Sequence, residues 1–258
     1  MKKKMILLLM LLACMVNAQA DNSISANTVD IPQGGAATID IKLDNDKQFK
    51  GFQLDLTLPE GISYVSYTKG SRLADHTVST SIQGGKRHFL VASTATNSPI
   101  SDDDKDGTIL SITVKADASL STSATPQAII SDVIFADSDG DTNVDGITVD
   151  FNVIQPVYNV TVSDINVEKG GTGTIEVALE NNIDFMYIRF DLTLPDGVSY
   201  VSSQVSDRLA DHSISYNEDN HRILASTLNN TAFTGTSGTV LTITVQADAS
   251  LDVNAELD

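Results

Sequence analysis

Apolar and polar residues alternate along most of this chain. Residues 38–43 read TIDIKL, and residues 174–179 read TIEVAL. Regular alternation places one set of side chains on a core and the other towards solvent, as in an antiparallel β-strand. Turn signals punctuate these runs at residues 34–35, 59–61, 84–85 and 106–107. Many short strands with frequent turns predict an all-β fold, and specifically a β-sandwich.

The alternating pattern occurs twice. Residues 55–66 read DLTLPEGISYVS, and 136 residues later residues 191–202 read DLTLPDGVSYVS. Because the similarity continues for about a hundred residues, the repeat is a duplicated domain, longer than a solenoid unit. In both copies the apolar positions of the central strand should point inward. These positions are Phe52, Leu54, Leu56 and Leu58, and then Ile188, Phe190, Leu192 and Leu194.

The second copy lacks part of the first. In the first copy, apolar runs at residues 128–135 and 147–153 predict two further strands, and the second copy has no counterpart before Asp258. A sandwich without two of its strands would expose a strip of core and an unpaired strand edge. Two interpretations are open. The sequence is a fragment, or a strand donated by another chain completes the sandwich.

The N-terminus predicts secretion. Three lysines, a short apolar run and the small residues of Ala18-Gln19-Ala20 are typical of a signal peptide. We therefore expect a signal peptide at residues 1–20, a first module at 21–155 and a second module at 156–258. The alternative is a lipobox-like run ending at Cys14, which would attach lipid there and bring the protein to a membrane. The expected location is secreted, extracellular or on a bacterial cell surface.

Composition narrows the function classes. The formal net charge is −18, and it becomes −21 when residues 1–20 are removed. Such an acidic chain repels nucleic acid, so no nucleic-acid partner is expected. The single cysteine is Cys14, so the mature chain has no disulfide, thiolate metal site or cysteine nucleophile.

Several motifs resemble a known family. A Gly-Gly turn at residues 34–35, the strand and turn GFQLDLTLPEG at 51–61 and the strand GTILSITVKA at 107–116 are similar to those of cohesin-type modules. The resemblance implies two tandem jelly-roll, immunoglobulin-like sandwiches. It also implies non-catalytic binding or scaffolding, with a dockerin-type or other extracellular protein as partner, in complexes that degrade polysaccharides. The same superfamily contains carbohydrate-binding modules, so a carbohydrate-binding or adhesive surface protein is the alternative.

A cohesin-like partner site is expected on one flat outer face of a sheet. In the first module it would contain Gln53, Asp55, Thr57, His88 and Leu90. In the second module it would contain Tyr187, Arg189, Asp191, Thr193, His221 and Ile223. Exposed aliphatic residues among polar neighbours suit a protein interface. The alternative is that these residues are scattered singly over a solvated strand.

Sugar binding usually needs flat aromatic side chains. The chain has no tryptophan, and Tyr187 is the best exposed candidate, with Gly51 at the matching position of the first module. An aromatic platform for polysaccharide is therefore not expected, although polar side chains and calcium remain an alternative route to sugar binding.

Two acidic runs suggest calcium. Asp102, Asp104, Asp106 and Gly107 match the start of a calcium loop, but Thr113 stands where the bidentate glutamate should be. The stronger candidate contains Asp137, Asp139, Asp141, Asn143 and Asp145. Crowded carboxylates repel one another unless a cation neutralises them. The alternative in both cases is a solvated acidic turn, and no other cofactor is expected.

One repeated motif invites a catalytic interpretation. Arg72-Leu73-Ala74-Asp75-His76 recurs at residues 208–212. No recognised motif places a base beside a nucleophile, so a local structural role for these residues is preferred. The chain is accordingly expected not to be an enzyme.

Overall fold

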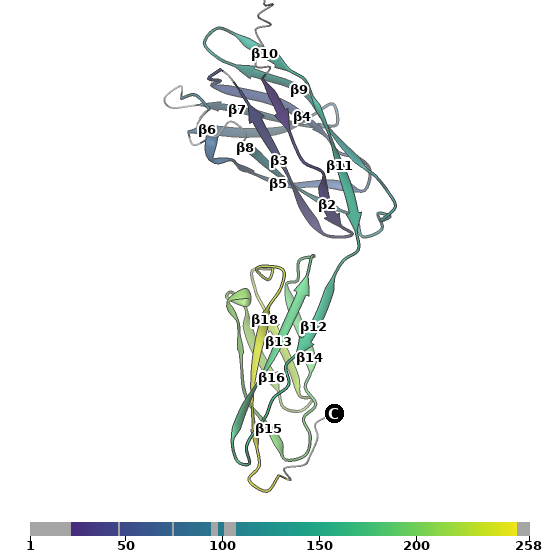
Figure 1. Ribbon diagram of the computed structural model, residues 1–258, viewed down its shortest axis with the longest axis vertical. Coiled ribbons are helices and arrows are strands. Elements are labelled where there is room, and N and C mark those ends of the chain that lie inside the picture. The colour runs from purple at the N-terminus through teal and green to yellow at the C-terminus, as the bar shows by residue number, and fades with distance from the viewer. Residues whose placement is uncertain (1–21, 46, 74, 94–97, 101–106, 252–258) are drawn as a thin grey trace, which may run out of the picture.

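The computed structural model describes residues 22–45, 47–73, 75–93, 98–100 and 107–251. The predicted signal peptide, Cys14 and the acidic residues Asp102, Asp104 and Asp106 lie outside these ranges. Figure 1 shows two bodies of strands joined end to end by a single connection. Within the described residues, no helix has the length and apolar content needed to cross a membrane. The predicted all-β sandwich class is confirmed, while the module boundaries stay a prediction.

The first module contains two sheets that face each other. One is four-stranded with the order β1-β3-β8-β5, formed by β1 (Ser23–Ser25), β3 (Ala36–Asp44), β8 (Thr108–Ala116) and β5 (Ile62–Lys69). The other has the order β2-β11-β9-β4-β7-β6, and β10 pairs with β9. Its strands are β2 (Val29–Pro32), β11 (Ile147–Ile154), β9 (Gln127–Ala136), β4 (Gly51–Thr57), β7 (Lys86–Ser93), β6 (His76–Gln83) and β10 (Asp141–Val144). Only β2 and β11 pair in parallel among these neighbours.

Alternation along the strands builds the core between these sheets. Phe52, Leu54 and Leu56 of β4 are buried, and the aliphatic residues of β8 are buried opposite them. Phe135 of β9 packs against two phenylalanines, with ring centroids 4.8 Å from Phe49 and 5.2 Å from Phe52. Burial of this apolar surface is the main stabilising contribution in a chain that has no disulfides.

The second module repeats the first four-stranded sheet. Its order is β12-β13-β18-β15, formed by β12 (Tyr158–Val162), β13 (Thr172–Asn181), β18 (Thr239–Ala247) and β15 (Val198–Val205). The strand irregularity at Tyr64/Ser66 recurs at Tyr200/Ser202, so even the register of the two copies agrees. A short 3-10 turn follows the equivalent strand in both modules. η1 (Ser71–Leu73) follows β5, and η2 (Asp207–Leu209) follows β15.

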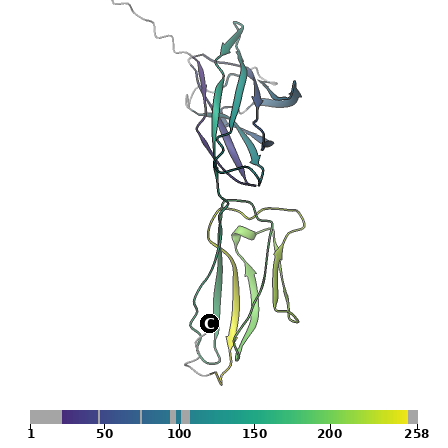
Figure 2. The ribbon, with the colours of Figure 1, turned by 90° about the vertical axis from the view of Figure 1, so that its right-hand side faces the viewer.

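The other sheet of the second module is smaller. It has three strands in the order β14-β17-β16, formed by β14 (Tyr187–Asp191), β17 (Arg222–Ser226) and β16 (Ser213–Asn217). Figure 2 shows its strands apart from the layer that contains β18. Within the described residues β14 is hydrogen-bonded to β17 alone, whereas β4 lies between β7 and β9. Ile188, Phe190 and Leu192 are consequently only half-buried.

Candidate functional site

The outer face of the larger sheet in the first module is ordered in rows across the strands. Because side chains alternate, residues paired in register point the same way. In the first row Leu90 of β7 lies opposite Gln53 of β4, and Gln53 lies opposite Ile134 of β9. Leu90 is 48% exposed. The row therefore presents two aliphatic side chains with one amide between them.

The middle row is charged and held in place. His88 is paired with Asp55, and the Nδ1 atom of His88 lies 2.7 Å from a carboxylate oxygen of Asp55. The Nζ atom of Lys86 lies 3.7 Å from Asp55 and 3.1 Å from Asp132. The hydrogen bond that Lys86 donates lowers the pKa of Asp132, and the same contact raises the pKa of Lys86. Asp55 and His88 are largely shielded from water, so they lie fixed at the centre of the face.

The third row adds a second exposed aliphatic side chain. Thr57 of β4 lies opposite Ile129 of β9, which is 49% exposed. Ile129 is in turn paired with Thr148 of β11. Leu90 and Ile129 thus lie on opposite sides of the central strand, with the charged row between them.

The structure brings the predicted residues of the first module together. Gln53, Asp55 and Thr57 lie half-buried along β4, with His88 and Leu90 beside them on β7. Ile129 and Ile134 were not among the predicted site residues. Both lie in the run at residues 128–135, which is apolar on both faces of the predicted strand, and that two-sided pattern was the available signal. Its outward half contributes to this face instead of lying under a covering layer.

The corresponding face of the second module has different charges. Arg222 donates from Nε and from a terminal nitrogen to the two oxygens of Asp191, at 2.7 and 3.0 Å. This hydrogen bonding lowers the pKa of Asp191. Tyr187 and Arg189 are exposed on the same strand, and Thr193 is exposed just beyond its end. The Asp55–His88 pair of the first module is therefore an aspartate–arginine pair here.

Two predicted residues of the second module are wrongly placed by the sequence analysis. Ile223 is completely buried in the core, and His221 lies in the turn before β17, where its φ is +52°. The register pairs Asp191 with Arg222 and Arg189 with Leu224. Arg222 and Leu224 are therefore the residues of β17 that point outward. A one-residue error in aligning the strands exchanges the two faces. Aligning Phe89 with Ile223, both buried, gives the correct register.

The second acidic run forms a hairpin turn. Asp139 and Gly140 donate their backbone N–H groups to Asp137 Oδ1, at 2.7 and 3.1 Å. Asp141 and Asn143 are exposed on β10, and Asp145 is exposed after it. Among the residues that the structure describes, no group of three or more acidic, histidine or cysteine side chains is arranged to hold a metal ion. Calcium binding at this turn stays a prediction.

The repeated Arg-Leu-Ala-Asp-His motif contributes to packing. Arg72 is buried, donates to the carbonyl oxygen of Leu43 at 2.5 Å and also donates to the side chain of Asn45. Arg208 makes the equivalent contacts with Leu179 and Asn181, both at 2.7 Å. His76 and His212 are both buried, and burial lowers the pKa of His76. These contacts hold the end of a strand to the loops beside it.

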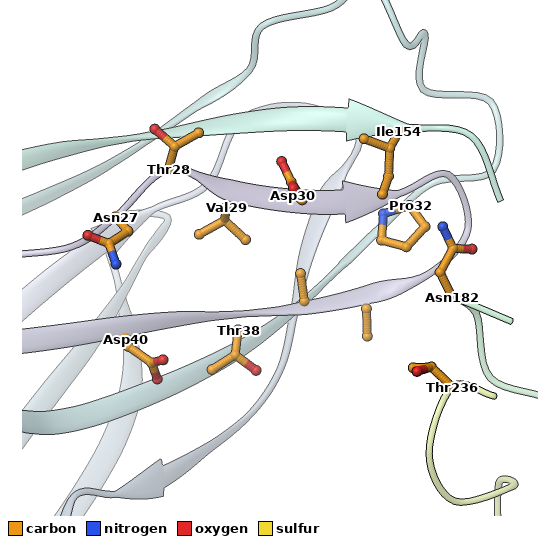
Figure 3. Close-up of a pocket in the computed structure, with 12 residues that line it drawn as sticks. Asn27, Thr28, Val29, Asp30, Pro32, Thr38, Asp40, Ile154, Asn182 and Thr236 are labelled. Carbon is orange, nitrogen blue, oxygen red and sulfur yellow. The ribbon is translucent and has the colours of Figure 1, made fainter. Parts of the chain in front are cut away.

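A hollow of about 460 Å³ lies beside β2 and β3, where Asn182 and Thr236 of the second module complete its lining (Figure 3). Its two carboxylates already accept hydrogen bonds. Asn152 donates to Asp30 at 2.8 Å, and Ser111 donates to Asp40 at 2.5 Å. The rest of the lining contains neither histidine nor cysteine.

Comparisons with known proteins find matches among solved structures. No protein-family model matches the chain, and no curated protein matches it. The chain is similar to a non-cellulosomal cohesin from the archaeon Archaeoglobus fulgidus, with 17% identity and a TM-score of 0.42 over 52% of this chain and 92% of that one. It is also similar to the sixth cohesin of Acetivibrio cellulolyticus scaffoldin B, with 17% identity and a TM-score of 0.43 over 52% and 99%. A third similar structure is CaCohA2 from Clostridium acetobutylicum, with 16% identity and a TM-score of 0.43 over 52% of this chain and 90% of that one.

Proposed function

We propose that this protein is a non-catalytic binding or scaffolding protein, and that the outer face formed by β9, β4, β7 and β6 binds another protein. The observation that carries the proposal is the pair Leu90 and Ile129, about half exposed on either side of the central strand. Exposed aliphatic side chains among polar neighbours suit a protein interface.

The face is well suited to rigid recognition. Asp55 and His88 are joined by a 2.7 Å contact and are largely shielded from water, so their positions are set before a partner arrives. A preorganised surface loses less conformational entropy on binding than a mobile one. The serines of β6 opposite Leu90 and His88, Ser79 and Ser81, add small donors and acceptors at the rim.

We infer that the partner is a dockerin-type module. Support comes from the cohesin-like motifs at residues 51–61 and 107–116, which form β4 with its following turn and β8. A secreted or cell-surface location and a role in polysaccharide-degrading complexes belong to the same proposal. The second module has Arg189 and Arg222 where the first has Gln53 and His88, so it should prefer a more acidic partner.

The test is a binding titration of the full chain against a panel of recombinant dockerin modules. Leu90→Asp should weaken binding at least about tenfold, because it replaces one of the two exposed aliphatic contacts with a charge. The matched control is Val65→Asp. Val65 is 51% exposed on β5 of the opposite sheet, and its substitution should leave the affinity unchanged.

Two results would contradict the proposal. One is that both substitutions have the same effect on dockerin binding. The other is that the chain is retained by insoluble polysaccharide while no dockerin in the panel binds, which would favour the carbohydrate-binding alternative.

A further inference from the structure

The connection between the two modules is short and is held on both sides. On the side of the first module, the pairing of β11 with β2 continues to Ile154, which lies opposite Pro32. Gln33 also donates its backbone N–H to the carbonyl oxygen of Ile154, at 3.0 Å. On the side of the second module, β12 begins at Tyr158 and pairs with β13 from that residue onward. Only residues 155–157 therefore lie between the two sets of strands.

Asn182 forms hydrogen bonds to this connection. Its Nδ2 atom donates to the carbonyl oxygen of Gln155 at 3.0 Å, and its Oδ1 atom accepts from the backbone N–H of Val157 at 2.6 Å. The backbone N–H of Asn182 also donates to the carbonyl oxygen of Val157, at 3.2 Å. Asn182 itself directly follows the last residue of β13. One asparagine at the end of a strand therefore bonds to the residues on both sides of Pro156.

The backbone of the connection has little rotational freedom. The ring of Pro156 fixes its own φ at about −65° and restricts the preceding residue, Gln155, to an extended conformation. The rotation that Pro156 retains lies between the carbonyl group of Gln155 and the N–H group of Val157. These are the two groups that the side chain of Asn182 bridges. The asparagine therefore restrains the one rotation that the proline ring leaves free.

A second contact joins the modules directly. Ile183, which follows Asn182, lies against the turn of the first module at Gly35. A β-carbon added at Gly35 would come within 3.1 Å of the Cγ2 atom of Ile183, so glycine permits this close approach. Asn182, Pro32 and Ile154 line the hollow at this junction (Figure 3). Because they surround a hollow and not a packed apolar interface, the connection itself must supply most of the restraint.

We propose that Asn182 holds the connection rigid, so that the two modules move as one body. Domains that share a small interface ordinarily move relative to each other, and the hydrogen bonds of Asn182 remove that freedom here. The outer face of the second module then keeps a fixed direction relative to the outer face of the first. The inference concerns the junction alone and does not depend on what either outer face binds.

The test measures the distance between two spin labels in the full chain by double electron–electron resonance. Labels are attached at Val65→Cys and Val201→Cys, because these valines are 51% and 48% exposed and lie one in each module. Cys14→Ser removes the only other cysteine. The labelled chain should give a single narrow distance peak. Asn182→Ala should replace that peak with a broad distribution, because it removes both side-chain hydrogen bonds to the connection.

Two further substitutions locate the effect. Asn159→Ala is the matched control, because Asn159 is exposed on β12 and donates to Glu180, at 3.2 Å, instead of to the connection. It should leave the narrow peak unchanged. Pro156→Gly loosens the connection without altering Asn182. It should broaden the distribution, because glycine frees its own φ and lifts the restriction on Gln155.

A second measurement distinguishes a loosened junction from an unfolded module. Hydrogen exchange in β13 and β18 should be the same in every variant as in the labelled chain with Asn182 and Pro156 intact. If Asn182→Ala unfolds the second module, Pro156→Gly takes its place in the comparison. The proposal is overturned if the chain with both residues intact gives a broad distribution. It is also overturned if the folded variant keeps the narrow peak.

Discussion

The arginine of the repeated motif makes several hydrogen bonds in each module, although Arg72 is buried and Arg208 is only half-buried. Arg72 donates to backbone carbonyls and to the side chain of Asn45, and Arg208 does the same with Asn181. A guanidinium presents several donors in a fixed plane, so one side chain can join a strand end to two loops. The asparagine counterparts Asn45 and Asn181 are both buried as well, so the pair acts as a structural unit in both copies.

Arg72→Met should therefore destabilise the first module. The substitution leaves buried acceptors without their donor, and we expect a loss of about 2–3 kcal/mol in the free energy of unfolding. Urea unfolding followed by circular dichroism measures this loss. Arg222→Met is the control, because Arg222 forms an exposed ion pair with Asp191 and its removal should change stability little. Equal effects of the two substitutions would contradict this structural role.

At the scale of the element, β9 contributes apolar side chains both to the core and to the outer face of its sheet. Its buried residues change parity, from Ala128 and Ile130 to Val133 and Phe135. The change occurs at Ser131 and Asp132, where the pairing with β4 is irregular and Asp132 has a φ of +51°. This is a β-bulge, and it lets Ile129 and Ile134 both face outward.

The bulge predicts different effects on stability for two substitutions at Asp132. Asp132→Val should lower the melting temperature of the first module, because a β-branched residue is strained at positive φ. Asp132→Gly should retain the bulge and lower it less, because glycine accepts this conformation. Thermal unfolding by circular dichroism compares the two variants. If Asp132→Val is the more stable of the two, the conformation at this position is not required for the fold.

Strand positions were largely predictable from the sequence, but pairings were not. The alternation at residues 38–43 lies in β3, as expected. The turn predicted at residues 59–61 follows the end of β4. The register of β17 was predicted one residue out, because the sequence there is apolar at Ile223, Leu224 and Ala225 and does not identify the inward side. The bulge in β9 was missed for the same reason, since a strand that is apolar on both faces hides a change of parity.

At the scale of the whole molecule, two separate cores share one chain. The buried residues form one cluster within residues 24–153 and another within residues 177–245. The first cluster is closed by β9 and β11, whereas the second leaves Ile188, Phe190 and Leu192 half-buried. Because less apolar surface is removed from water in the second module, its stability should be lower.

We therefore expect the two modules to unfold at different denaturant concentrations. Hydrogen exchange in rising urea should expose β13 and β18 before their counterparts β3 and β8. These strand pairs have matching registers in the two copies, so each serves as the control for the other. Simultaneous loss of protection in all four strands would show that the cores are coupled and would contradict the expectation.

The sequence by itself determined the β-sandwich class, the duplication and the outward side of β4, because these follow from a period of two and from two similar runs of residues. Only the tertiary structure decided which strands lie side by side. That arrangement places Ile129 and Ile134 of β9 beside Gln53 and Thr57 of β4. It also makes Arg72 a packing residue and leaves one edge of β14 unpaired within the described residues. These properties depend on contacts between segments far apart in the chain, and the pattern of apolar and polar residues within one segment does not determine such contacts.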